Sequence, residues 1–208
     1  MKARTSAPVL LRRLGCLALA IAGLVVLAAP GPRRVGRAPF TTFNTVCAKC
    51  HEAECSGRLS FQGGVDSTRE HVRRYAGSAS DAEVTEFFAL LRRMKEQCSY
   101  YPAVEGGVPS GAWDAAALAS FFEPSERSYF LPLGTFRTGE CRVRLHFDRD
   151  TAASAQVMTS HLEAALEVAL PTRERDATLA WPCRADESYY LRLRAEGEAR
   201  LVRMEPVR

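Results

Sequence analysis

The chain has 208 residues, of which 47% are hydrophobic and 25% are charged, as in an ordinary globular protein. The formal net charge is +4, but seven of the 28 basic residues and none of the 24 acidic residues lie within residues 1–38. The remainder holds 21 basic against 24 acidic residues and is mildly acidic. Nucleic-acid binding requires a basic face, so we expect no nucleic-acid partner.

The first 38 residues predict an export signal. Basic residues up to Arg13 precede an apolar run from Leu14 to Ala29, and this order is typical of a secretory signal. The alternative is an uncleaved membrane anchor through residues 14–29, although these 16 residues are short for a spanning helix. Both interpretations place the rest of the chain in the periplasm or on the outer face of the cytoplasmic membrane.

Helices are predicted throughout the first half of the exported part. Their expected ranges are Phe40 to His51, Ser67 or Thr68 to Tyr75, Ser80 or Asp81 to near Cys98, and about Gly111 to Phe122. The third is the clearest, because apolar residues recur at steps of three and four and give it one apolar face. These residues are Val84, Phe87, Phe88, Leu91 and Met94.

The most specific motif is Cys47-Ala48-Lys49-Cys50-His51, at the end of the first predicted helix. Its two thiols can add to the vinyl groups of one haem, and the adjacent imidazole then serves as the proximal ligand of the iron. A zinc half-site would need a second pair of ligands. A thioredoxin-like redox pair follows a strand, whereas helices flank this motif. We therefore expect one covalently attached haem c, bound through Cys47, Cys50 and His51.

With this motif in place, residues 39–123 resemble a class I cytochrome c. Phe43 stands four residues before the motif, where that family often has an aromatic residue. Leu118 and Phe121 resemble the Leu-x-x-aromatic pair of the family's last helix. The resemblance implies a small helical fold that wraps the haem, with His51 on one side of the iron and usually a methionine on the other.

The sixth ligand of the iron is left open by the sequence, because the loop Ser99–Pro102 before the last helix offers no methionine. Met94 is the favoured distal ligand, since it follows His51 by 43 residues, roughly the distance of the family. It also continues an apolar stripe, which favours a place in the core. His71 is the alternative and would give a haem with two histidine ligands. An open sixth position would indicate gas or peroxide chemistry.

The second half is predicted to be mostly β, with one helix. The expected strands are Tyr129 to Phe136, Cys141 to Phe147, Leu179 to Cys183, Tyr189 to Arg194 and Arg200 to Met204, and the expected helix is Met158 to Leu170. The second strand alternates strictly between apolar and polar residues, as a half-buried strand does. No catalytic constellation is recognisable here, so we interpret this half as a docking module for a partner.

Four cysteines remain after the signal and the Cys-x-x-Cys-His motif are set aside. An exported chain lies in an oxidising compartment, so we expect these four cysteines to form two disulfides. Of the three possible pairings we prefer Cys55–Cys98 and Cys141–Cys183, which keep each bridge within one half of the chain.

These features together predict an α+β protein, in which a small all-α cytochrome c-like haem domain is followed by a β-rich domain with one helix. The expected divisions are residues 1–38 for the signal or anchor, 39–124 for the haem domain and 128–208 for the β-rich domain. The expected function is a periplasmic monohaem c-type cytochrome that carries electrons between redox partner proteins, alone or within a larger oxidoreductase. An electron carrier is favoured over an enzyme. The alternative is a haem-based gas or redox sensor, or a haem enzyme, with an open sixth coordination position.

Overall fold

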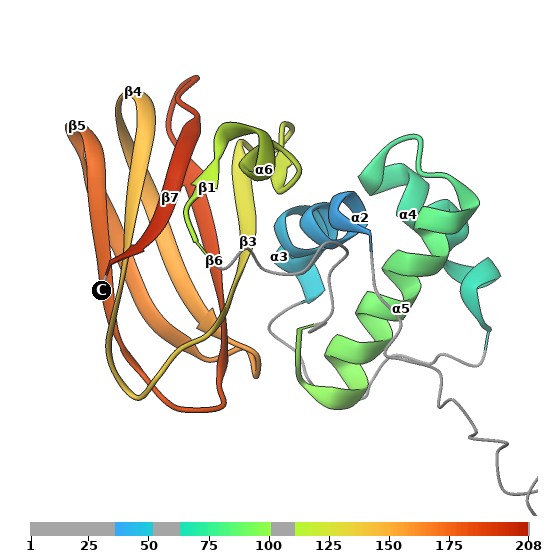
Figure 1. The fold of residues 1–208 in the computed structure, drawn as a ribbon. Helices are drawn as coiled ribbons and strands as arrows, with labels where there is room; N and C mark the ends of the chain where they lie inside the picture. The colour runs from blue at the N-terminus through green and yellow to red at the C-terminus, as the bar shows by residue number, and fades with distance from the viewer. Residues whose placement is uncertain (1–35, 52–62, 101–110, 208) are drawn as a thin grey trace, which may run out of the picture. The chain divides into compact units, whose positions relative to one another are not determined.

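A computed structural model describes residues 36–51, 63–100 and 111–207 (Figure 1). These residues belong to one compact unit, Arg34–Arg208. The expected signal or anchor through residues 14–29 lies outside the described ranges. Within those ranges, no helix is long and apolar enough to cross a membrane.

Three consecutive helical segments carry the Cys-x-x-Cys-His motif. They are α2 (Arg37–Thr42), the π-helix η1 (Phe43–Cys47) and α3 (Ala48–His51). The 3₁₀-helix η2 (Val65–Thr68), α4 (Arg69–Ala76), α5 (Asp81–Gln97) and the short α6 (Ala115–Ala119) follow along the chain. The first three predicted helices are thus confirmed. The fourth is reduced to α6, because short strands occupy both of its ends.

Helix α5 begins where the sequence predicts it. The Ser80 hydroxyl accepts a hydrogen bond from the Glu83 N–H (3.3 Å), and the Glu83 carboxylate accepts one from the Ser80 N–H (2.8 Å). This reciprocal pair is a capping box, which fixes the first turn of a helix. The two hydrogen bonds from Ser80, through its backbone and then its side chain, hold the pKa of Glu83 below its usual range.

The strands form one seven-stranded sheet in the order β1-β7-β4-β6-β3-β2, and β5 pairs with β4 outside this path. Their bounds are β1 Trp113–Asp114, β2 Phe122–Glu123, β3 Ser128–Thr135, β4 Gly139–Thr159, β5 Ala164–Cys183, β6 Ser188–Ala195 and β7 Leu201–Val207. Every pair is antiparallel. All five predicted strands are confirmed, although Cys141–Phe147 and Leu179–Cys183 are parts of the longer β4 and β5.

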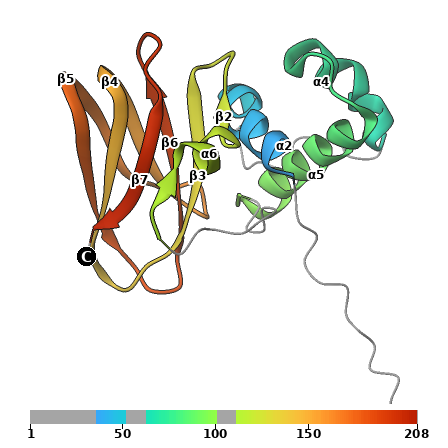
Figure 2. The same cartoon turned by 45° about the horizontal axis from the view of Figure 1, so that its top comes forward.

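Strand β4 joins two parts of the sheet, because it changes partner along its length. Residues 142–147 pair with β7, residues 153–159 pair with β6, and β5 runs beside both parts (Figure 2). The register shifts between His146 and Thr151, where the partner changes. Such irregularities bend a strand and increase its twist, which lets one strand of 21 residues serve both parts.

One of the two expected disulfides is confirmed. Cys141 near the start of β4 is bonded to Cys183 at the end of β5, with 5.8 Å between their Cα atoms. Cys98 is also disulfide-bonded. Its expected partner, Cys55, lies outside the described residues, so the Cys55–Cys98 pairing stays a prediction.

An aromatic cluster connects the helices to the sheet. It consists of Phe40 from α2, Tyr100 after α5, Phe130 from β3 and Tyr190 from β6, and each of the four is at most 2% exposed. The ring centroid of Phe130 lies 5.3 Å from that of Phe40, 5.1 Å from that of Tyr100 and 5.6 Å from that of Tyr190. At such separations each aromatic pair contributes about 0.5–1.5 kcal/mol beyond the buried area.

The expected fold class, with a small all-α haem domain beside a β-rich domain, is wrong. The sheet is the main element, and one buried cluster includes Phe43 and Met94 from the helices together with Leu131 and Leu191 from the strands. The physical reason is that α2 packs against α5 on one side and against β2 and β3 on the other, as the contact between Phe40 and Phe130 shows. The helices and the strands therefore share one core instead of forming two separate domains.

The one helix predicted in the second half, Met158–Leu170, is also wrong. Strand β4 continues to Thr159, and β5 begins at Ala164 after a turn. Alanine, leucine and glutamate favour a helix in this stretch. Its apolar residues also alternate, however, and they pair with apolar residues of β4, as Leu166 does with Val157. Pairing across strands outweighs the local propensity here.

Candidate functional site

A π-helical turn lies directly before the Cys-x-x-Cys-His motif. The Ala48 N–H donates to the Phe43 carbonyl, five residues back, rather than to Asn44 as in a regular α-helix. The Asn44 carbonyl instead accepts a hydrogen bond from Nε of Arg192, at 3.2 Å. Isolated π turns within helices are frequent at functional sites, and this one includes Cys47, the first residue of the motif.

Arg192 ties this turn to the sheet. Its position on β6 lets it donate to Oε1 of Gln156 on β4 at 3.0 Å, while its guanidinium carbon lies 5.5 Å from the centre of the Phe130 ring. Each contact restricts the same side chain, so the guanidinium is a rigid support for the Asn44 carbonyl. Sequence reasoning missed Arg192, because 148 residues separate it from Asn44 and no local pattern marks it.

The two motif thiols differ in environment. Cys47 is half-buried, Cys50 is exposed, and neither forms a disulfide. Burial, with smaller contributions from the charges of Cys50 and Glu123, raises the pKa of the Cys47 thiol to about 11. A redox-active dithiol requires a lowered thiol pKa, so this environment disfavours the thioredoxin-like interpretation of the motif.

Haem-free protein, produced without maturation of the motif, should therefore show slow alkylation at Cys47. At pH 8 its thiolate population is smaller by roughly two orders of magnitude than that of a thiol with the usual pKa of about 8.5. Iodoacetamide labelling, followed by peptide mass spectrometry, would measure this in the Cys50→Ser variant. The Cys47→Ser variant, which keeps only the exposed motif thiol, is the control and should label faster. Equal rates in the two variants would contradict the described burial.

Two histidines from different helices meet beside these thiols. The rings of His51 on α3 and His71 on α4 have their centroids 6.0 Å apart, with an angle of 67° between their planes. Burial, followed by the charges of Lys95 and His71, lowers the pKa of His51. A lowered pKa favours the neutral imidazole, which is the form that binds a metal. The ring of Tyr75 lies 5.0 Å from that of His71 on its own helix.

These residues fit a haem c. The two thiols could attach the group through its vinyl positions, and the imidazoles of His51 and His71, whose ring centroids lie 6.0 Å apart, could bind its iron. Among the described residues, no group of three or more His, Cys, Asp or Glu side chains could hold a metal ion.

Met94, the distal ligand favoured by the sequence, is 1% exposed and belongs to the hydrophobic core, and its role as a ligand stays a prediction. Met158 on β4 is also buried, and its sulfur accepts a hydrogen bond from the Tyr100 hydroxyl at 3.5 Å. His146 pairs with Asp176 on the neighbouring strand.

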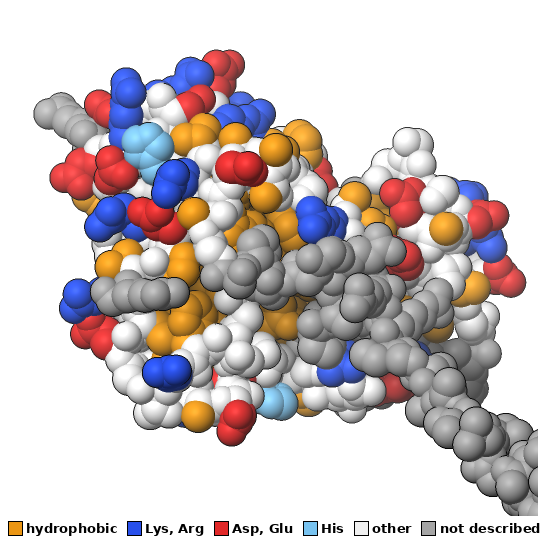
Figure 3. Space-filling model, viewed as in Figure 1, with side chains coloured by type: hydrophobic (Ala, Val, Ile, Leu, Met, Phe, Trp, Pro, Cys, Tyr) orange, Lys and Arg blue, Asp and Glu red, His pale blue; other side chains and the backbone are white. Residues whose placement is uncertain are grey.

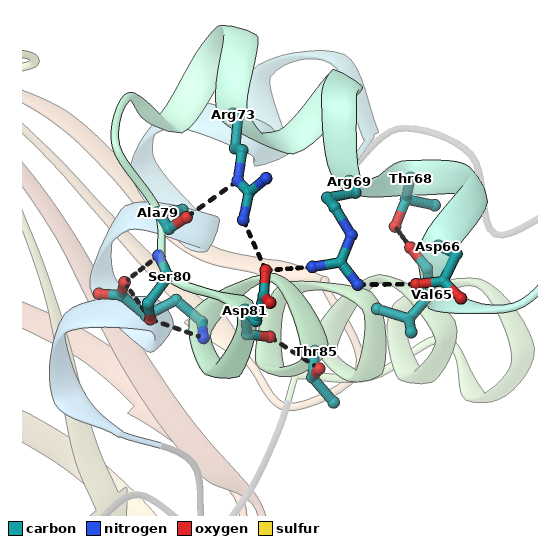
Figure 4. Close-up of polar contacts among 10 residues, drawn as sticks. Val65, Asp66, Thr68, Arg69, Arg73, Ala79, Ser80, Asp81 and Thr85 are labelled. Carbon is teal, nitrogen blue, oxygen red and sulfur yellow. Dashed lines mark hydrogen bonds and ion pairs between the residues drawn. The ribbon is translucent and has the colours of Figure 1, made fainter.

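Polar contacts connect helix α4, which carries His71, to its neighbours (Figure 4). Arg69 and Arg73, on either side of His71 in the sequence, both pair with the same carboxylate oxygen of Asp81, the first residue of α5. Nε of Arg73 also donates to the Ala79 carbonyl at 3.2 Å. The position of the second histidine therefore depends on charged side chains that sequence reasoning had not connected with it.

No family model matches the chain, and no curated protein matches it. Three solved structures show partial similarity. A CBM4 structure has a TM-score of 0.23 at 15% identity, over 38% of this chain and 56% of that one. A GH115 4-O-methyl-α-glucuronidase with specificity for decorated arabinogalactans has a TM-score of 0.31 at 13% identity, over 70% and 24%. A β-glucosidase from Paenibacillus barengoltzii has a TM-score of 0.28 at 11% identity, over 67% and 17%. The chain spans less than two thirds of each, and similarities this low carry no argument about fold or function.

Proposed function

We propose that this chain is an exported monohaem c-type cytochrome that carries electrons between redox partner proteins. In this proposal Cys47 and Cys50 would attach the haem, and His51 and His71 would bind its iron. The observation that carries the proposal is the 6.0 Å separation of the two imidazoles, which come from different helices and meet beside the paired thiols.

The bound haem would supply an iron that gains and loses one electron. The two thiols would fix the group to the helix, and the two imidazoles would bind its iron. Two protein ligands would leave no position open for a substrate or gas, so they favour electron transfer over the alternative of a sensor or enzyme. We prefer His71 to Met94 as the distal ligand, because His71 lies beside His51, whereas Met94 packs in the core. Two histidines also imply a lower reduction potential than a His/Met pair.

Export forms part of the proposal. Residues 1–38 have the order of a secretory signal, and the Cys141–Cys183 disulfide suits an oxidising compartment such as the periplasm. Acidic and basic side chains are interspersed on the face shown in Figure 3. This mixture favours a redox partner that docks through shape complementarity and individual ion pairs. Long-range attraction by a large patch of one charge is not favoured.

The test is to produce the full chain in a host that attaches haem c and exports proteins carrying a secretory signal. We expect one haem per chain that survives denaturing electrophoresis, a sharp low-spin spectrum on reduction, and reversible one-electron oxidation. The Cys47→Ser/Cys50→Ser variant should lose the covalent haem entirely. The Cys141→Ser/Cys183→Ser variant, which also loses two cysteines, should keep it. Wild-type protein that matures without covalent haem in a competent host would overturn the proposal.

A further inference from the structure

The helix that carries His71 has little apolar anchoring. Helix α4 has eight residues and none of them is buried, although Val72 and Ala76 pack partly against the core. An isolated helix of this length is unstable in water. Its position, and with it the position of the His71 imidazole, must come from contacts with its neighbours.

The main polar contact of α4 is a carboxylate on the next helix. Asp81 Oδ1 accepts hydrogen bonds from the guanidinium groups of Arg69 and Arg73, the latter at 2.5 Å (Figure 4). One carboxylate oxygen therefore contacts side chains from two consecutive turns of α4. Asp81 is itself well placed, because it opens α5 directly after the capping residue Ser80. On α4, Arg69 also donates to the exposed Asp66 at 2.7 Å, and Arg73 donates to the Ala79 carbonyl at 3.2 Å.

We propose that Asp81 is a positioning residue that latches α4 and thereby sets how often His71 leaves the iron. This inference rests on the proposed function, in which His71 is an axial ligand. The side chains of Arg69, Arg73 and Asp81 are 33%, 44% and 70% exposed. Exposed ion pairs of this kind are weak and are screened by salt. The latch consequently makes access of a small neutral ligand such as carbon monoxide to the iron sensitive to ionic strength.

The experiment measures carbon monoxide binding by the reduced, haem-loaded full chain at saturating gas, where the rate is set by departure of His71. In Asp81→Asn we expect this rate to rise about fivefold, the factor that loss of two exposed ion pairs supports. Raising the salt concentration from about 0.01 M to about 1 M shortens the screening length from about 30 Å to about 3 Å. The wild-type rate should then approach that of Asp81→Asn, whose own rate should change much less.

Matched variants separate the latch from a general loss of structure. Glu96→Gln removes the carboxylate of an exposed ion pair with Arg92 on the same helix, and it should leave the rate unchanged. Arg69→Gln should raise the rate without altering the first turn of α5, and Asp81→Glu should restore part of the wild-type behaviour. An Asp81→Asn rate equal to wild type, in protein with covalent low-spin haem, overturns the latch alone. Absence of covalent haem overturns the proposed function and the latch together.

Discussion

In the haem-loaded protein, His71→Ala is expected to leave the haem attached and to convert its low-spin spectrum into a high-spin one. The two thioethers and His51 remain, so attachment does not depend on His71, but one axial imidazole is lost. If His71 fills its position for about 99% of the time, its removal raises the apparent affinity for carbon monoxide about a hundredfold. Visible absorption spectra of the reduced and oxidised protein, with and without the gas, measure both changes.

Met94→Leu is the matched control for this result. The substitution preserves volume in a core position and should cost less than about 1.5 kcal/mol of stability, and we expect the low-spin spectrum to persist. Added imidazole should restore the low-spin spectrum of His71→Ala, because the free ligand can occupy the vacated position. A spectrum that changes in Met94→Leu and not in His71→Ala would instead identify Met94 as the ligand. Wild-type protein that is already high-spin would favour the sensor or enzyme.

The parts of the fold that the sequence predicted are those governed by local chemistry. Helix α5 carries its own start signal, the Ser80 and Glu83 capping box, and a regular apolar stripe, so its bounds follow from neighbouring residues. Strand β6 likewise alternates between buried leucines and more exposed arginines from Leu191 to Arg194. The helix predicted for Met158–Leu170 failed because its residues satisfy both helical and strand periodicities, and the partner strand decides between them.

The candidate site likewise has a part that local sequence predicts and a part that depends on tertiary packing. Cys47, Cys50 and His51, the residues proposed to hold the haem, lie within five consecutive residues and are recognisable as a motif. The sequence offered His71 only as the alternative to Met94, because the approach of His71 to His51 depends on how α4 packs against its neighbours rather than on the spacing of the two residues. The role of Arg192 is harder still to predict from local sequence. The Asn44 carbonyl that it binds is left without its helical partner by a π turn, and no residue pattern predicts that turn.

The second large effect is expected from the aromatic cluster, where Phe130→Ala should destabilise the protein by about 3–5 kcal/mol. Phe130 is fully buried and contacts three other rings and the Arg192 guanidinium, so its truncation leaves a cavity where helix and sheet meet. Tyr75→Ala is the control, because Tyr75 is 62% exposed, and it should change stability by less than about 0.5 kcal/mol. Denaturant titration measures both values, and Phe130→Leu gives a smaller shift in the same direction if Phe130→Ala does not fold.

The same titration tests whether the helices and the sheet unfold together. Far-UV circular dichroism follows the helices, while tryptophan fluorescence follows the sheet, because Trp113 and Trp181 lie on β1 and β5. A shared core predicts coincident transitions for the two signals in wild type and in Phe130→Ala. If the helical signal were lost first and Phe130→Ala moved only the sheet transition, the helices would be an independent unit. That outcome would contradict the continuous core that joins Phe40 to Phe130.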